Sequence, residues 1–329
     1  MKLPIAHCRP PIRVDVAPRA ATLRTPHSTL RVWLAFSLIE ILVVVGLLSV
    51  IILGLLAMFT QTQRAFRTGM TQTDVLEGGR FVADMIAREL RQVTPSYQPR
   101  PATNFYAWLP NYTALLQPLA GSTSARTNMT EDLIFLTRRN QDWIGIGYFV
   151  RDGEPGALSF PTLGMGTLYR VESTALPLSG RSPADLCRNI HDAVYENKTN
   201  LPVNISKIMG GVLHFKVRAF DTNGFWIVQD QDVSASRQQK NTDIKMSTSV
   251  APGEVGQYAF FSNAVPATVE LEVGILEDRA WQHYKALPWM SAAKQEDEPK
   301  YRYVTNLAGR VHLFRQRIPI QNVDPAAYQ

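Results

Sequence analysis

Few side chains of this 329-residue sequence have the types and spacing of a metal site. Cys187 and His191 stand four residues apart, but no second Cys or His pair lies nearby to complete a tetrahedral zinc site. Four oxygen-bearing side chains follow one another too irregularly for an EF-hand calcium loop, and a plain turn accounts for the first two. These four are Asp221, Asn223, Asp230 and Asp232. The sequence therefore predicts no metal site and no cofactor.

Residues that catalyse common reactions are present, but not in a catalytic pattern. The sequence has no Gly-x-Ser-x-Gly, His-Glu-x-x-His, Walker or Rossmann motif. Two of the six histidines belong to the first 35 residues, and the remaining four form no pair. These four are His191, His214, His283 and His312. A surface or hydrogen-bonded histidine is the simpler interpretation for each, so we expect no catalytic residue and no enzymatic activity.

Glu40 is the one ionisable side chain in a long apolar run. The run, residues 36 to 59, spans about 36 Å as a helix and is long enough to cross a bilayer. A carboxylate in such a run is costly unless it has a partner or a function. Because Glu40 is only the fifth residue of the run, it can also remain at the lipid headgroups. Both interpretations are open on this ground alone.

The net charge of the chain is concentrated before this run. Residues 1 to 35 contain six basic residues and one acidic residue, and so carry +5 of the formal charge of +6. The positive-inside rule places this leader in the cytoplasm and the chain after residue 59 across the membrane. The rest of the chain is nearly neutral, so we expect no nucleic-acid binding.

The residues around Glu40 form a recognisable motif, followed by the long apolar run. The motif is Ala35, Phe36, Ser37, Leu38, Ile39 and Glu40. It resembles the processing site of type IV prepilins and type II secretion pseudopilins, although Ala35 stands where the family usually has Gly. The resemblance implies that a prepilin peptidase cleaves between Ala35 and Phe36 and that Phe36 is N-methylated. It also implies that Glu40 pairs with the amino group of Phe36 in a neighbouring subunit, which offsets the cost of burying both charges.

After residue 59 the pattern changes from uniformly apolar to amphipathic. Apolar residues recur mainly at spacings of three, four or seven from Val75 to Val93, with charged residues between them. Pro95 disfavours helical geometry at the residue before it and has no N–H, so it ends the pattern. The sequence predicts one helix from residue 36 to about residue 93, with a transmembrane half at 36–59 and an amphipathic half within 60–94. The Gly78-Gly79 pair is a candidate bend or close-packing point.

Residues 95 to 329 predict an exported β-rich domain. Apolar alternation and β-branched runs mark five strands, at 133–136, 143–150, 168–171, 212–220 and 267–276. The turn at 221–224 predicts a hairpin between 212–220 and 225–228. A last pair of strands is expected at 301–304 and 311–314, on either side of Ala308-Gly309.

Polar stretches predict three loops in this domain, at 96–130, 174–207 and 229–258. The second loop is expected to contain a short helix near residues 185 to 195. The predicted fold class is therefore α+β, with a long N-terminal helix packed on a mainly antiparallel β-sheet.

The order of these segments resembles the J-type minor pseudopilins of type II secretion and the W-type minor pilins. Gly224-Phe225-Trp226 and the run from Val265 to Glu270 occupy the places of a Gly-Trp hairpin and a following strand in those proteins. The resemblance implies a minor pilin or pseudopilin whose partners are the prepilin peptidase, other pilin subunits and an inner-membrane assembly platform. It implies a single-pass inner-membrane protein with a cytoplasmic N-terminus and a periplasmic domain, which later enters a filament.

Two other function classes remain open from the residues. One is a signal-anchored periplasmic binding protein or enzyme, for which the motif at Glu40 would be a coincidence. The other is an adhesin or DNA-uptake pilin, to which the near-neutral charge after residue 35 gives little support.

Overall fold

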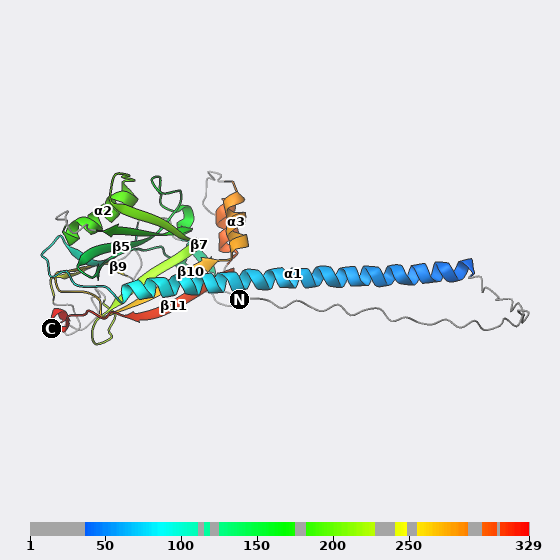
Figure 1. Ribbon diagram of the computed structural model, residues 1–329, viewed down its shortest axis with the longest axis horizontal. Helices are drawn as coiled ribbons and strands as arrows, with labels where there is room; N and C mark the ends of the chain where they lie inside the picture. Colours follow the sequence, from blue (N-terminus) through cyan, green and yellow to red (C-terminus); the bar gives the residue numbers. More distant parts are fainter. Residues whose placement is uncertain are drawn as a thin grey trace, which may run out of the picture. The chain divides into compact units, whose positions relative to one another are not determined.

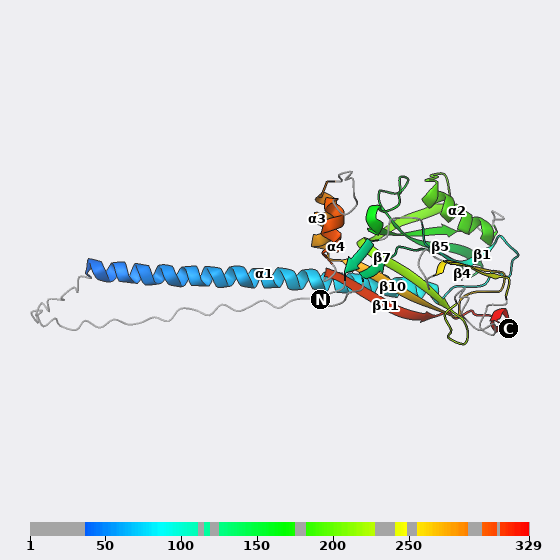
Figure 2. The same cartoon turned by 180° about the vertical axis from the view of Figure 1, so that it is seen from behind.

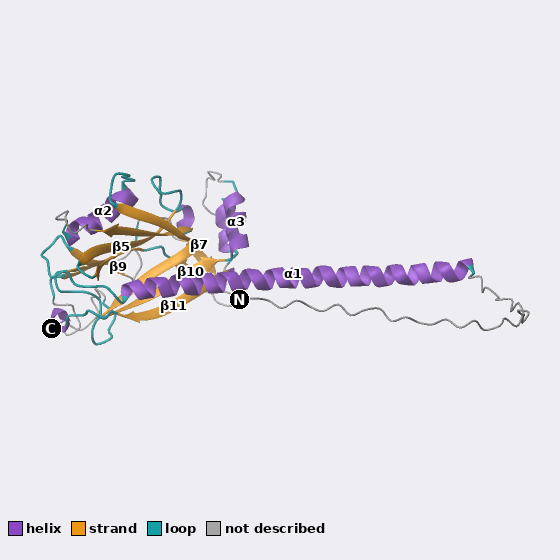
Figure 3. Ribbon diagram, viewed as in Figure 1, coloured by secondary structure: helices purple, strands orange, loops and turns teal. Residues whose placement is uncertain are grey.

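The computed structural model describes most of the chain, which divides into two units, Met1–Gln61 and Thr62–Gln329. The long helix α1 (Leu38–Leu90) contributes its first half to the first unit and its second half to the second. Strands make up much of the second unit, as Figure 3 shows. The described residues are 37–110, 115–118, 125–174, 182–227, 241–248, 255–288, 298–307 and 310–328.

The second half of α1 has one buried face. Val75, Val82, Ile86 and Leu90 are buried, and their spacing of seven, four and four residues is the one the amphipathic pattern predicts. This apolar face packs on the sheet of the second unit, so the predicted α+β fold class, a long helix on an antiparallel sheet, is confirmed.

The helix ends three residues earlier than predicted. α1 stops at Leu90, and Val93 instead forms a bridge with Thr137. The N–H of Thr94 donates to the carbonyl of Leu136, so the chain joins the sheet before it reaches Pro95. Pairing with a strand replaces the last helical turn, which the local sequence pattern does not reveal.

Nine described strands form one antiparallel sheet, ordered β11-β10-β7-β6-β5-β4-β1-β9-β8. The order places β10 between β7 and β11, so three strands that are distant in the sequence lie side by side (Figure 1). A separate pair joins β2 (Leu115–Pro118) to β3 (Ala125–Asn128). The nine strands are β1 (Thr103–Trp108), β4 (Asp132–Arg139), β5 (Asp142–Arg151), β6 (Gly166–Thr174), β7 (Val203–Phe220), β8 (Ile244–Thr248), β9 (Val255–Phe261), β10 (Thr268–Leu276) and β11 (Val311–Pro319).

Helices cover both faces of this sheet. On one face, Ile86 of α1 shares a core with Phe135 of β4. On the other, Ile190 of α2 (Pro183–Tyr195) packs near Phe149 of β5. The remaining helical elements are α3 (Asp278–Ala286), α4 (Pro299–Thr305) and the 3-10 turns η1 (Thr162–Gly164) and η5 (Pro325–Tyr328).

Gly79 marks a close approach of α1 to the sheet. A Cβ at this position would lie 2.1 Å from the ring of Phe314 on β11, and one at Gly78 would lie 2.6 Å from the side chain of Met209. Of the two alternatives for this glycine pair, close packing is therefore confirmed.

Two of the predicted loops contain strands, so the loop prediction is wrong for these parts. The segment 96–130 includes β1, β2 and β3, and the segment 229–258 includes β8 and the start of β9. β1 pairs with β4 and β9, which are distant in sequence, and its Phe105 and Ala107 are buried between them. Short strands held by distant partners show little local alternation.

The segment 174–207 includes the predicted short helix. α2 begins two residues before the predicted start, at Pro183, because the carboxylate of Asp185 accepts a hydrogen bond from the N–H of Ser182 at 3.2 Å in a capping box. The segment is not only a loop, because β7 starts within it at Val203.

The predicted hairpin after β7 is present but short. The N–H of Gly224 donates to the carbonyl of Asp221 in the turn, the N–H of Ile227 donates to the carbonyl of Ala219, and Phe220 and Trp226 form an antiparallel bridge. Over most of its length β7 pairs instead with β6 and β10. The predicted strand at 301–304 is wrong, because these residues belong to α4, whose N-cap Glu298 accepts from the N–H of Tyr301 at 2.9 Å. β11, the other half of that pair, is present but pairs with β10.

Candidate functional site

The first half of α1 is an apolar helix that no described residue of the chain covers. In the described part of the chain it is the one helix long and apolar enough to cross a membrane, and none of its apolar window is buried. Leu42 and Ile51 are each more than half exposed. From Leu38 to Phe59 the helix spans about 33 Å, close to the thickness of a bilayer's hydrocarbon core. Lipid or apolar helices of other chains must supply its cover.

Ser37 and Glu40 form the start of this helix. The N–H of Glu40 donates to the hydroxyl of Ser37 at 3.3 Å and to its carbonyl at 3.0 Å. Ser37 therefore occupies the N-cap position and Glu40 the third helical position, the spacing of a capping box. Leu38 and Ile39, between them, are 81% and 66% exposed, so the first turn also lacks cover.

This geometry leaves both roles of Glu40 open. As a cap it places its negative charge at the positive end of the helix, which favours the charge. As an exposed carboxylate at the end of an apolar helix it is also accessible to a cation from another subunit. The two remaining residues of the predicted processing site, Ala35 and Phe36, lie outside the described residues.

In the second unit, Glu89 fixes the last turns of α1 to the sheet. Its carboxylate accepts from the hydroxyl of Tyr148 at 2.5 Å and lies 2.8 Å from the guanidinium of Arg170. Arg170 also pairs with Glu172 at 2.6 Å. Burial and the charge of Glu89 raise the pKa of Tyr148, so its hydroxyl stays protonated and continues to donate. The contacts join α1 to β5 and β6.

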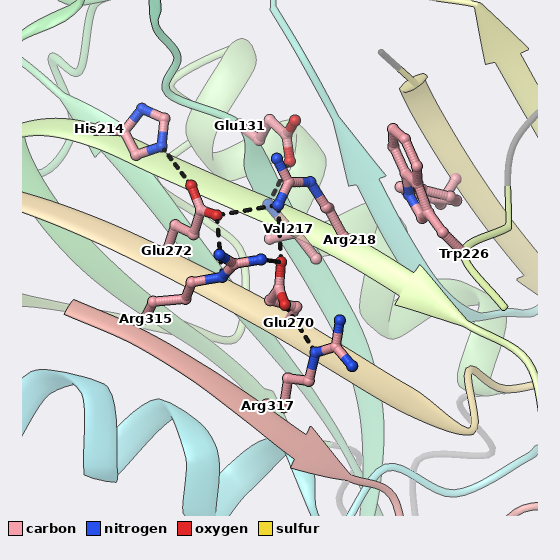
Figure 4. Close-up of polar contacts among 10 residues, drawn as sticks. Glu131, His214, Val217, Arg218, Trp226, Glu270, Glu272, Arg315 and Arg317 are labelled. Atoms are coloured by element: carbon pink, nitrogen blue, oxygen red, sulfur yellow. Dashed lines mark hydrogen bonds and ion pairs between the residues drawn. The ribbon is translucent and has the colours of Figure 1, made fainter. Parts of the chain in front are cut away.

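A charged network covers the sheet where β7, β10 and β11 meet (Figure 4). The buried carboxylate of Glu270 is paired with Arg218 at 2.7 Å, Arg315 at 2.7 Å and Arg317 at 2.8 Å. Burial alone would raise the pKa of Glu270, but hydrogen bonds from the three guanidinium groups outweigh it and lower the pKa to about 2. Glu270 is therefore charged at neutral pH.

His214 lies at the edge of the same network. Its Nε2 is 3.3 Å from the carboxylate of Glu272, and its Nδ1 accepts from the N–H of Met129 at 3.1 Å. Nδ1 is therefore unprotonated and Nε2 carries the proton toward Glu272. The hydrogen bond from His214 lowers the pKa of Glu272. The interpretation of His214 as a hydrogen-bonded histidine is confirmed.

Cys187 and His191, the candidate metal ligands of the sequence, lie about one turn apart on α2. Among the described residues no three His, Cys, Asp or Glu side chains gather as a metal ion would require. The side chain of Asp221 accepts from the N–H groups of Asn223 and Phe225, which is the plain turn that the sequence predicts. Asp230 and Asp232 lie outside the described residues.

The sequence does contain a signal for the network around Glu270, but the signal is visible only when three strands are compared with one another. Glu270 and Glu272 alternate in one strand, and basic residues alternate in two others, at Lys216 with Arg218 and at Arg315 with Arg317. In each strand alone, the alternating charged residues indicate only a face that is exposed to solvent. Opposite charges at the same period in three strands indicate cross-strand pairing.

No protein-family model matches this chain. No curated protein matches it. Among solved structures it is similar to a type IV-like pilin from Thermus thermophilus, at 14% identity and a TM-score of 0.27, over 75% of this chain and 95% of the other.

Proposed function

We propose that this chain is a membrane-anchored filament subunit of the pilin type. The observation that carries the proposal is the first half of α1, an uncovered apolar helix with one carboxylate in its first turn. Such a surface is stable only where lipid or apolar helices surround it. A filament subunit meets this requirement twice, because lipid surrounds its apolar helix in the bilayer and the apolar helices of other subunits surround it in the filament.

The processing chemistry follows from the same segment. We propose that a prepilin peptidase cleaves the Ala35–Phe36 bond at the cytoplasmic surface and that Phe36 is then N-methylated. The new amino group carries a positive charge at the start of an apolar helix, where it needs a counter-ion. Glu40 of a neighbouring subunit is the proposed counter-ion, and its exposure in the first turn supports this role.

We further propose a place among the minor pilins or pseudopilins, with an inner-membrane assembly platform and other pilin subunits as partners. Support comes from the order of the strand motifs. The turn at Gly224 precedes Trp226, and Phe220, which is bridged to Trp226, also pairs with Thr268 of β10. The two motif segments of the resemblance therefore meet at one end of β7.

The mature N-terminus tests the proposal directly. Mass spectrometry of the full-length protein, recovered from membranes of cells with and without the prepilin peptidase, should find N-methylated Phe36 only with the enzyme. A matched variant, Phe36→Asp, changes the residue after the cut and should remain uncut. An intact leader in wild-type cells would overturn the proposal and favour a signal-anchored periplasmic protein.

A further inference from the structure

Strand β11 forms one edge of the nine-stranded sheet, and among the described strands only β10 pairs with it. The pairing runs from Val311 to Pro319 without a register shift. In Figure 2, β11 lies at the lower rim of the sheet. A regular edge strand of this length is a template to which a further strand can add.

The pairing with β10 defines which backbone groups of β11 are open. The carbonyl of Arg310 accepts from the N–H of Glu277, and the N–H of Ile320 donates to the carbonyl of Ala267, so the even-numbered residues between them bond to β10. The odd-numbered residues therefore direct their N–H and C=O groups away from β10. Within the described chain, no printed bond reaches these groups. We call these residues the open edge: Val311, Leu313, Arg315 and Arg317.

Three side chains of the open edge lie on the face of the sheet that is turned away from α1. Phe314 points toward Gly79 of α1, so its neighbours Leu313 and Arg315 point to the other face, as does Arg317. Leu313 is 46% exposed, and the side chains of Arg315 and Arg317 are 55% and 62% exposed. A strand added to the open edge would place its own alternate side chains directly opposite these three.

The two arginines of the open edge are fixed in place but can still bind. Glu270 pairs with both, and the guanidinium of Arg317 lies over the ring of Phe220, 4.6 Å from its centroid. Arg317 donates to Glu270 through its Nε, and no bond is drawn to its two terminal nitrogens in Figure 4. A guanidinium fixed in this way loses little side-chain entropy when it binds a further carboxylate.

β10 shows which side chains match the open edge from across a strand pair. Its Glu272 stands opposite Arg315 and its Glu270 opposite Arg317, whereas Gly274 leaves Leu313 uncovered. Opposite charges stabilise directly facing positions of two strands, and like charges destabilise them. A matching strand on the open side therefore has carboxylates at two alternate positions and an apolar residue at the next one.

A second copy of this chain offers no such strand. Antiparallel pairing of β11 with itself would bring guanidinium groups together, which is unfavourable. The other edge strand, β8, has Lys245 as its one charged residue, and the separate pair of β2 and β3 contains no carboxylate. The acidic residues of the described strands belong to β4, β5, β6 and β10, which are paired on both sides. The charges of the open edge thus disfavour self-association and favour a different chain.

We infer that the open edge of β11 binds an extended acidic segment of another protein subunit as an added antiparallel strand. Two alternate carboxylates of the segment pair with Arg315 and Arg317, and an apolar side chain covers Leu313. Backbone hydrogen bonds to the open edge supply affinity, and the alternate side chains supply specificity. The inference rests on the proposed role as a minor subunit, which meets subunits unlike itself, and it states the chemistry of one such partner.

A synthetic strand tests the inference on the full-length chain in detergent. The probe is the labelled peptide fluorescein-Thr-Glu-Val-Glu-Val-Leu-Thr-amide, whose two Glu residues face Arg317 and Arg315 in antiparallel register and whose Leu faces Leu313. Fluorescence anisotropy measures its affinity. We expect the matched peptide with Lys at both Glu positions to bind at least tenfold more weakly. Equal affinities, or no binding of the acidic peptide, would overturn the inference.

Backbone methylation separates strand addition from simple attraction between charges. In the predicted register the N–H groups of the two Glu residues point toward β11 and those of the two Val residues point away. N-methylation of both Glu residues should therefore weaken binding at least tenfold, whereas N-methylation of both Val residues should leave it within about twofold. If the two methylated peptides bound equally well, the segment would not be an added strand.

The position of binding is tested by a matched pair of variants. Arg317→Gln should lower the affinity of the acidic peptide at least fivefold, whereas Arg302→Gln, on the exposed surface of α4, should not change it. Equal effects of the two variants would place binding elsewhere. Light scattering identifies a second copy as the occupant, and overturns the inference, if the peptide binds by dissociating a dimer. The N-terminal mass of the same samples shows separately whether Phe36 is processed.

Discussion

Glu40 has two candidate roles, and they need different properties of its side chain. A helix cap needs a hydrogen-bond acceptor, whereas a counter-ion for an amino group needs charge. Glu40→Gln keeps the first and removes the second, so we expect incorporation into filaments to fall at least tenfold, equivalent to about 1.4 kcal/mol, while membrane insertion is unchanged. Sheared filaments and membrane fractions, probed by immunoblot, measure both quantities.

Ser37→Ala is the matched control for this prediction. It removes the hydroxyl that accepts from the N–H of Glu40 and costs about 1 kcal/mol of helix stability, but it leaves the charge of Glu40 in place. Incorporation should therefore stay near the wild-type level. If Ser37→Ala lowered incorporation as much as Glu40→Gln, the cap would be the important feature and cross-subunit pairing would lose its support.

The ion pairs of Glu270 should make the stability of the β domain depend on pH. Its pKa of about 2 in the folded state lies below the usual value near 4.5, so its charge stabilises the fold above pH 4.5 and this contribution is lost as the pH falls toward 2. Because two of its three arginine partners are half exposed, the contribution is about 1 to 3 kcal/mol. Urea unfolding of wild type and Glu270→Gln should show the two stabilities converging as the pH falls. A constant difference would contradict this.

At the scale of the elements, the contact of α1 with β11 depends on Gly79, which has no side chain beyond its Cα. Gly79→Ala places a methyl group against the ring of Phe314, and we expect a loss of about 1 to 3 kcal/mol in unfolding free energy. Gly69→Ala is the control, since a Cβ there meets nothing within 4 Å and the helix gains up to about 1 kcal/mol in propensity. Thermal unfolding in detergent measures both changes. Equal melting temperatures for the two variants would show that Phe314 moves aside at no cost.

How much of each element could be predicted depended on where its partners lie. Consecutive residues carry the apolar period or the cap that predicts α1, β5, β7, β10 and α2. The local pattern does not predict β1, β8 and β9, because their pairing comes from distant strands. It predicts a strand in place of α4, although Glu298 followed by Pro299 is a helix-start signal. The residues of the predicted processing motif are contiguous and so can be recognised in the sequence. The partners of Glu270 come from β7 and β11, so no single strand predicts their pairing.

For the whole molecule, the division of α1 between two units has a testable consequence. The first described residue with a buried apolar side chain is Val75, so no described residue before 62 belongs to the core of the second unit. We expect residues 62–329 to be soluble without detergent and to unfold cooperatively, because the segment that needs lipid is absent.

A shorter fragment, residues 91–329, provides the contrast. It removes the buried side chains of α1, among them Val75, Val82, Ile86 and Leu90, each contributing about 1.5 to 3 kcal/mol, which together rival the 5 to 15 kcal/mol of a typical domain. We expect this fragment to aggregate or to lose its cooperative transition. Circular dichroism melting of both fragments measures the difference. If residues 91–329 melted as cooperatively as residues 62–329, the amphipathic half of α1 would be an accessory to the sheet and not part of its core.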